Sequence, residues 1–312
     1  MGININYNTK LSYLLSFVVL ILVFFWFIFS DEIKVFKPKG LFEFNLEEYN
    51  LNISFRFAIG LFLSLLIPSL SYTILRENKL FEGDISVLYL SLSIIIAAFP
   101  QILIQIEWLL ISILLLVSLR TLSSVHNQIN IKKEASILGI FSGILVFFEP
   151  ILILLVIPNL IGMALLRSFQ LKESLFFLVN LFVLFFWILS IFHLLDIDYS
   201  VDYYYEFKLR DMENKIVMTL FFPLQAFILL KAFLGSSKMV IRKKNQVKLF
   251  FGFLISIIIL LLFLPLPVIL TLLVFPFILL FAIFFQAQKH QGITSFLLFS
   301  VALFFILINF FL

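Results

Sequence analysis

Cysteine is absent from this 312-residue sequence, and charged residues make up only 13% of it. The absence of cysteine excludes disulfide bonds, thiolate metal sites and cysteine nucleophiles. Histidine is scarce as well, and its three residues, at positions 126, 193 and 290, are too widely spaced to predict a metal cluster. The sequence therefore indicates no particular cofactor, and we predict no metal site.

Long polar stretches are also missing. The longest run from 30 to 54 and from 196 to 215, and each is too short to form a soluble domain. Hydrophobic residues make up 63% of the chain and the mean hydropathy is +1.17, whereas soluble domains are about half apolar and a quarter charged. We therefore predict a single transmembrane domain over residues 1–312, with outer loops at 30–54 and 196–215 and a basic cytoplasmic loop at about 236–248.

Ten hydrophobic segments predict an all-α, polytopic integral membrane protein. They cover residues 11–29, 55–75, 85–99, 102–119, 132–167, 171–195, 216–234, 249–264, 268–285 and 293–312. The first segment lacks the short apolar core and small-residue cleavage site of a signal peptide, so we expect it to be a retained span. We also expect Pro68, Pro158 and Pro223 to interrupt their segments, because proline removes a helical hydrogen bond.

The segment 132–167 decides the topology, because it is too long for one crossing. About 20 apolar residues span a bilayer core, yet Lys133 and Arg167 enclose far more, interrupted only by Glu134 at the start and by Glu149, which Pro150 follows. The segment is either one over-long helix, giving ten spans, or a hairpin that turns at Glu149, giving eleven. Within it, Gly139 and Gly143 predict a face of small residues for close helix packing.

The distribution of Lys and Arg favours the hairpin. With eleven spans and a cytoplasmic N-terminus, 15 of the 22 basic residues are cytoplasmic and seven are outside. The seven are Lys34, Lys37, Lys39, Arg56, Lys208, Arg210 and Lys215. With ten spans, 13 would be outside and nine inside, against the positive-inside rule. We expect a bacterial inner-membrane protein with a periplasmic C-terminus, whose basic run from Lys238 to Lys248 orients the chain and attracts anionic lipid headgroups.

Four acidic residues are candidate site residues at the outer face. Asp31 and Glu32 follow the first span directly, where a carboxylate can act as a general base. Glu107 and Glu149 are embedded in apolar sequence, where an unpaired carboxylate costs several kcal/mol, so that each needs a partner, a proton or water. The simpler interpretation is that Asp31 and Glu32 end a span and that Glu149 caps a wet turn.

Aromatic residues accompany carboxylates in the second outer loop. Tyr203, Tyr204 and Tyr205 lie close to Asp202 and Glu206. Aromatic faces next to carboxylates suit sugars and cations, although tyrosine is also common at any membrane interface.

Residues 11–167 resemble the membrane-embedded C-type (GT-C) glycosyltransferases. The resemblance rests on the acidic pair Asp31 and Glu32 after the first span, on Glu107 after the third, and on the hairpin with Ala135, Gly139, Gly143, Glu149 and Pro150. It implies an outward-facing site that takes a sugar from a lipid-linked donor, with Asp31 or Glu32 as the catalytic carboxylate. Two features depart from it: Glu precedes the hairpin proline where many such enzymes have Lys, and the outer loops lack a basic set suited to a lipid pyrophosphate.

The whole chain also resembles uncharacterised Phe-rich polytopic proteins of the bacterial envelope, which imply no activity. We expect a GT-C-like protein that handles a lipid-linked sugar or another envelope precursor at the outer face. Glu107, Glu149 and Tyr203 to Tyr205 would then bind the substrate. Expected partners are membrane lipids, a polyprenyl-linked substrate and envelope-complex proteins, and no nucleic acid.

Two alternatives remain open from the sequence. One is a non-catalytic scaffold or subunit of an envelope complex. The other is a carrier of a small molecule or lipid, for which Asn159, Asn180 and Gln225 are the polar candidates near the middle of the membrane.

Overall fold

The structure, a computed structural model, describes residues 5–29, 53–125, 131–166, 171–194, 215–237, 239–288 and 291–311. These residues form eleven α-helices and no β-strand, which confirms the all-α class. The helices are α1 (Ile5–Phe29), α2 (Ile53–Glu77), α3 (Ser86–Ala98), α4 (Ile106–Ser124), α5 (Lys132–Phe148), α6 (Val156–Leu166), α7 (Leu171–Leu194), α8 (Lys215–Ser236), α9 (Ile241–Ile259), α10 (Leu266–Gln286) and α11 (Gln291–Phe311).

Seven of these helices contain a stretch long and apolar enough to cross a membrane. The shorter apolar helices of the described residues cover 12–27, 86–98 and 150–166. Several long apolar helices in one chain confirm a polytopic membrane protein.

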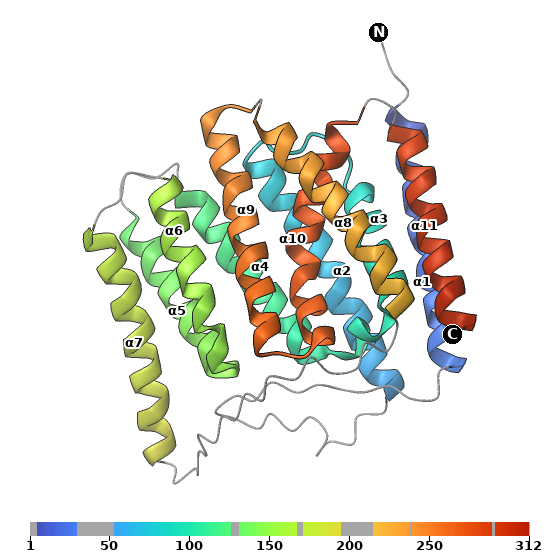
Figure 1. The fold of residues 1–312 in the computed structure, drawn as a ribbon. Coiled ribbons are helices and arrows are strands. Elements are labelled where there is room, and N and C mark those ends of the chain that lie inside the picture. The colour runs from blue at the N-terminus through green and yellow to red at the C-terminus, as the bar shows by residue number, and fades with distance from the viewer. Residues whose placement is uncertain are drawn as a thin grey trace.

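Successive helices run in opposite directions through one bundle (Figure 1). The start of α1 and the end of α11 therefore lie at opposite ends, which we call the upper end and the lower end as Figure 1 draws them. The starts of α5 and α9 lie at the upper end, and the starts of α2 and α4 lie at the lower end. This arrangement is the one expected from eleven crossings.

Helix α10 forms the centre of the bundle. It contacts α2, α3, α4, α8 and α9, and every residue from Val268 to Phe285 is buried. The only hydroxyl group in this stretch belongs to Thr271, which donates to the carbonyl of Pro267 at 2.8 Å. Helix α10 is apolar on all sides, and a helix without a polar face is expected to be surrounded by other helices.

The segment that decides the topology is a hairpin, as predicted. Helix α5 ends at Phe148, Glu149 adopts an extended conformation, and the chain returns through the 3₁₀ helix Pro150–Leu155 (η3) and α6. Across the hairpin, the side-chain amide of Asn159 donates to Ser142 Oγ at 3.1 Å. Ser142 precedes Glu149 and Asn159 follows it, so their side chains can meet in this way only if the chain folds back between them.

The predicted small-residue face of α5 packs against α7. A Cβ atom at Gly139 would lie 2.3 Å from the Phe177 carbonyl oxygen, and one at Gly143 would lie 2.8 Å from Leu184 Cδ2. Both glycines therefore allow a close approach of the two helices. Among the described side chains of α7, only Glu173, Phe177 and Leu181 are buried, so a single stripe of α7 makes this contact.

The predicted effect of three prolines is wrong. Pro68 and Pro223 lie inside the continuous helices α2 and α8, and Pro158 lies in the first turn of α6. Proline removes only one hydrogen bond, and tightly packed membrane helices tolerate this loss. The helical path does break at Pro100 and Pro150, where 3₁₀ helices begin, as expected from the end of the segment 85–99 and from the hairpin turn at Glu149.

The basic loop predicted at 236–248 is largely helical. Residues 241–248 form the first two turns of α9, and only a short turn separates them from α8. The charges suggested a loop because Lys and Arg are rare inside membranes. Both residues nevertheless favour helices, and their long side chains can reach the interface from the end of a span.

Candidate functional site: a buried ion pair at the lower end

A buried ion pair joins α2 and α4 near the lower end of the bundle. Arg56 Nη2 lies 3.3 Å from Glu107 Oε1, and the two residues are only 2% and 6% exposed. Arg56 lies in the first turn of α2 and Glu107 in the first turn of α4. Glu107, one of the predicted site residues, therefore has a partner that the prediction did not single out.

Gly60 explains why Arg56 faces α4. It lies one turn after Arg56 on the same side of α2, and a Cβ atom there would lie 1.5 Å from the carbonyl oxygen of Leu103. Only glycine allows the backbone of α2 to touch the 3₁₀ helix Pro100–Ile104 (η1) in this way. The close approach places Arg56 beside the residues that follow η1.

The break before α4 positions Glu107. Pro100 begins η1, and α4 starts again at Ile106, so that Glu107 falls in a first helical turn. A carboxylate at that place is stabilised by the unpaired N–H groups and the dipole of the helix. Gln105 and Trp108, on either side of it, are 0% and 1% exposed. The carboxylate therefore lies in the protein interior.

The ion pair leaves one donor and one acceptor unused. Arg56 Nη1 and Glu107 Oε2 are buried and have no hydrogen-bond partner. An unsatisfied buried polar group costs about 1–3 kcal/mol, and a charged one costs more. Such a group in a native structure points to water, an ion, a ligand or a catalytic role. A ligand that accepts from Nη1 and donates to Oε2 would satisfy both atoms.

Glu149 lies at the same end of the bundle, at the turn of the hairpin between α5 and η3 (Figure 1). The structure confirms that it marks the turn. It is 1% exposed, so the simpler interpretation of a water-exposed cap is wrong.

The other predicted site residues lie outside the described residues. They are Asp31, Glu32, Tyr203, Tyr204 and Tyr205. The prediction that these residues join Glu107 and Glu149 in one site therefore stays a prediction. Among the residues that the structure does describe, no three His, Asp or Glu side chains gather as metal ligands would.

A second polar contact at the lower end compensates for the break after α3. The side-chain amide of Asn309 in α11 donates to the carbonyls of Ala97 and Ala98, at 2.9 and 3.2 Å. Trp26 Nε1 of α1 in turn donates to the Asn309 carbonyl at 3.0 Å. The last carbonyls of α3 lack helical partners because the helix stops before Pro100, and Asn309 supplies them. This contact is structural.

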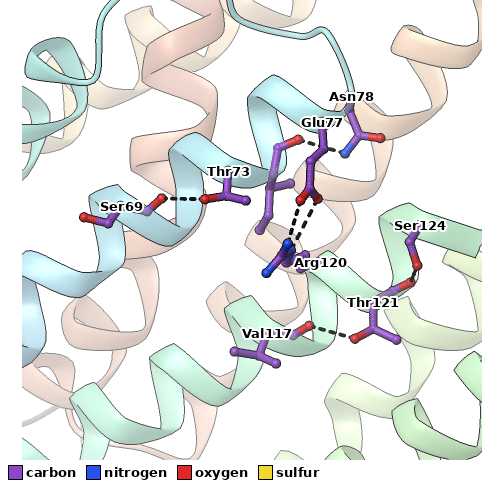
Figure 2. Close-up of polar contacts among 9 residues, drawn as sticks. Ser69, Thr73, Glu77, Asn78, Val117, Arg120, Thr121 and Ser124 are labelled. Carbon is purple, nitrogen blue, oxygen red and sulfur yellow. Dashed lines mark hydrogen bonds and ion pairs between the residues drawn. The ribbon is translucent and has the colours of Figure 1, made fainter.

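The upper end holds a different ion pair, shown in Figure 2. Arg120 of α4 binds the Glu77 carboxylate of α2 through two nitrogens, at 2.6 and 3.3 Å. Both side chains are nearly half exposed. Next to Glu77, the Asn78 amide donates to the Ile74 carbonyl at 2.8 Å and accepts from Gln246 of α9. These contacts join α2, α4 and α9, and the exposed pair is a natural control for the buried one.

The polar candidates for a carrier lie on three different helices. Asn159 of α6 donates to Ser142, and Asn180 of α7 donates to Ser136 at 3.1 Å, so both bind α5. Gln225 of α8 is buried, and its side-chain oxygen has no hydrogen-bond partner. In the buried stretch of the central helix α10, from Val268 to Phe285, Thr271 is the only polar residue.

Sequence reasoning missed Arg56, which we counted only as one of the seven outer basic residues. The available signal was its place four residues into an apolar helix, where a cation needs a partner. Comparison with known protein families, with curated proteins and with solved structures found no match. A proposal for the function therefore has to start from the residues and their geometry.

Proposed function

We propose that the protein is a GT-C-like protein of the bacterial inner membrane that handles a lipid-linked sugar or another envelope precursor at the outer face. The observation that carries the proposal is the buried Arg56–Glu107 pair with its unused donor and acceptor. In a sugar phosphate, the phosphate oxygens can accept hydrogen bonds from Arg56, and the sugar hydroxyl groups can donate hydrogen bonds to Glu107. Arg56 also supplies a buried cation for the phosphate.

The proposed orientation follows from charge. Arg76, Arg120, Lys132 and the basic turn of α9 all lie at the upper end, which makes this end cytoplasmic under the positive-inside rule. The lower end, with Arg56, Glu107 and Glu149, then faces outward. A lipid-linked precursor would reach the pair from the outer leaflet, and Asp31 or Glu32 would act as the catalytic carboxylate.

The experiment uses purified protein in lipid nanodiscs and a polyprenyl-phosphate-linked, radiolabelled hexose. We expect saturable binding of this donor and slow release of the hexose. Asp31→Asn with Glu32→Gln should abolish release and preserve binding, whereas Glu77→Gln, at the other end, should preserve both. A wild-type protein that does not bind the donor would contradict the proposal.

A second candidate function, a non-catalytic subunit of an envelope complex, is favoured by α7. This helix packs along one stripe against α5, and it exposes Phe182, Phe186 and Trp187 by 63–71%. Such a surface suits a partner helix as well as lipid. Purification in mild detergent should then recover a stoichiometric partner that Phe186→Ser with Trp187→Ser releases, while the donor-binding assay shows nothing.

A further inference from the structure

One face of α9 carries cations above apolar side chains. Lys244 and Lys248 lie one turn apart near the upper end, and Ile255 and Ile259 follow on the same face after two to three more turns. Lys248 is exposed and Lys244 partly so, while the two isoleucines are 55% and 46% exposed. Along this face, cationic side chains are followed by apolar ones, in the same order as the headgroup and the acyl chains of a phospholipid that lies alongside the helix.

The other faces of α9 are held by neighbouring parts of the protein. The Asn245 amide donates to the Leu165 carbonyl of α6 at 2.9 Å, and the Gln246 amide donates to Asn78, which directly follows α2. Val247 is completely buried. Because these contacts fix the rotation of α9, Lys244 and Lys248 are presented outward from a rigid platform.

The positive charge of this region is not neutralised within the described part of the chain. The ion pairs Arg56–Glu107 and Glu77–Arg120 both lie outside α9. The first turn of α9 contains Arg242, Lys243 and Lys244, with no acidic residue and no side-chain cap. The positive end of the helix dipole adds to these charges. A bound anion would therefore be stabilised here.

Exposed apolar residues beside the cations place the region at a membrane surface. Val240 and Ile241, directly before the basic turn, are 72% and 77% exposed. Free anions in water would gain nothing from these side chains, whereas a lipid bilayer would cover them. The occupant that satisfies both the cations and the apolar residues is an anionic phospholipid.

We propose that this face of α9 binds one anionic phospholipid, with its phosphate between Lys244 and Lys248 and its acyl chains along Ile255 and Ile259. The two lysines are separated by about 6 Å along the helix axis, a distance that their flexible side chains can bridge around one phosphate. The site lies at the opposite end from Arg56 and Glu107, so it does not depend on the proposed function.

The test measures thermal unfolding of the purified protein in detergent with added phosphatidylglycerol, phosphatidylcholine of the same chain length, or sodium phosphate. Native mass spectrometry counts the bound lipids. We expect phosphatidylglycerol alone to raise the melting temperature. The double variant Lys244→Gln with Lys248→Gln should show at most half of this increase in melting temperature and should bind one lipid fewer. The double variant Lys244→Arg with Lys248→Arg should show the full increase and bind as many lipids as the wild type.

The matched control is Lys132→Gln with Lys133→Gln, which removes two exposed cations from the same end of the bundle. It should behave as the wild type does. Equal stabilisation by phosphatidylcholine would overturn the proposal, as would equal stabilisation by free phosphate. The proposal would also be overturned if the control lost as much of the phosphatidylglycerol-induced increase in melting temperature as the α9 variant does. The lipid would then be attracted by the overall positive charge of this end and not by the two lysines of α9.

Discussion

Arg56 Nη2 of α2 lies 3.3 Å from Glu107 Oε1 of α4, and the two residues are 51 positions apart in the sequence. Both are buried at the lower end of a bundle whose central helix, α10, is almost entirely apolar. A charge in such surroundings is stable only with its partner. The pair therefore ties two helices together, and it leaves Arg56 Nη1 and Glu107 Oε2 without hydrogen-bond partners.

The first prediction concerns the loss of one partner. Glu107→Gln leaves Arg56 buried without a counter-charge, so we expect a loss of about 3–5 kcal/mol in the free energy of unfolding. The matched control, Glu77→Gln, breaks the exposed pair with Arg120 and should cost about 0–1 kcal/mol. Steric trapping in bicelles measures both. Equal losses would show that burial of the Arg56–Glu107 pair has no energetic consequence.

The second prediction concerns Gly60, which positions Arg56. The Cβ of Gly60→Ala would collide with the Leu103 carbonyl, so α2 has to move away from η1 at a cost of about 1–3 kcal/mol. Gly235→Ala in α8 is the control, because its Cβ would meet no atom within 4 Å, and it should stabilise the helix by about 0.5–1 kcal/mol. If both variants melt at the same temperature, the close contact at Gly60 does not contribute to the stability of the protein.

The third prediction concerns topology, and the native chain needs no cysteine removed. Phe263, in the turn between α9 and α10, is 38% exposed, and it follows the hairpin in the sequence. Phe263→Cys should react with a membrane-impermeant maleimide on intact spheroplasts, as should Ser54→Cys at the exposed start of α2. Lys133→Cys at the upper end should react only after lysis. If Phe263→Cys reacted with the maleimide only after lysis, the chain would cross the membrane ten times. Every loop after residue 167 would then lie on the opposite side of the membrane from the one proposed.

The hairpin could be predicted from the sequence because its signals are local. The length of the segment, Glu149 with Pro150, and the count of flanking cations all pointed to a turn there, and the hydrogen bond between Ser142 and Asn159 confirms it. The packing face at Gly139 and Gly143 could be predicted for the same reason. Both features depend on residues close together in the chain.

The ion pair could not be predicted, because its partners are distant in the sequence and their meeting depends on how α2 packs against η1. Counting the basic residues on each side of the membrane assigns Arg56 to the outer face, but it does not identify the residue that pairs with it. The prolines show the same limitation: Pro68 and Pro100 both follow apolar runs, yet only Pro100 begins a break. Whether a proline ends a helix depends on the partners that the freed carbonyls find, such as Asn309 for α3.

The most direct test of the site is the double variant Arg56→Met with Glu107→Leu. Replacing a buried ion pair with apolar residues of similar volume is often neutral or stabilising, so the protein should fold with a free energy of unfolding close to that of the wild type. Binding of polyprenyl phosphate, measured by equilibrium titration in nanodiscs, should weaken at least tenfold. Wild-type affinity in this folded variant would contradict the assignment of the Arg56–Glu107 pair as the site that recognises the precursor.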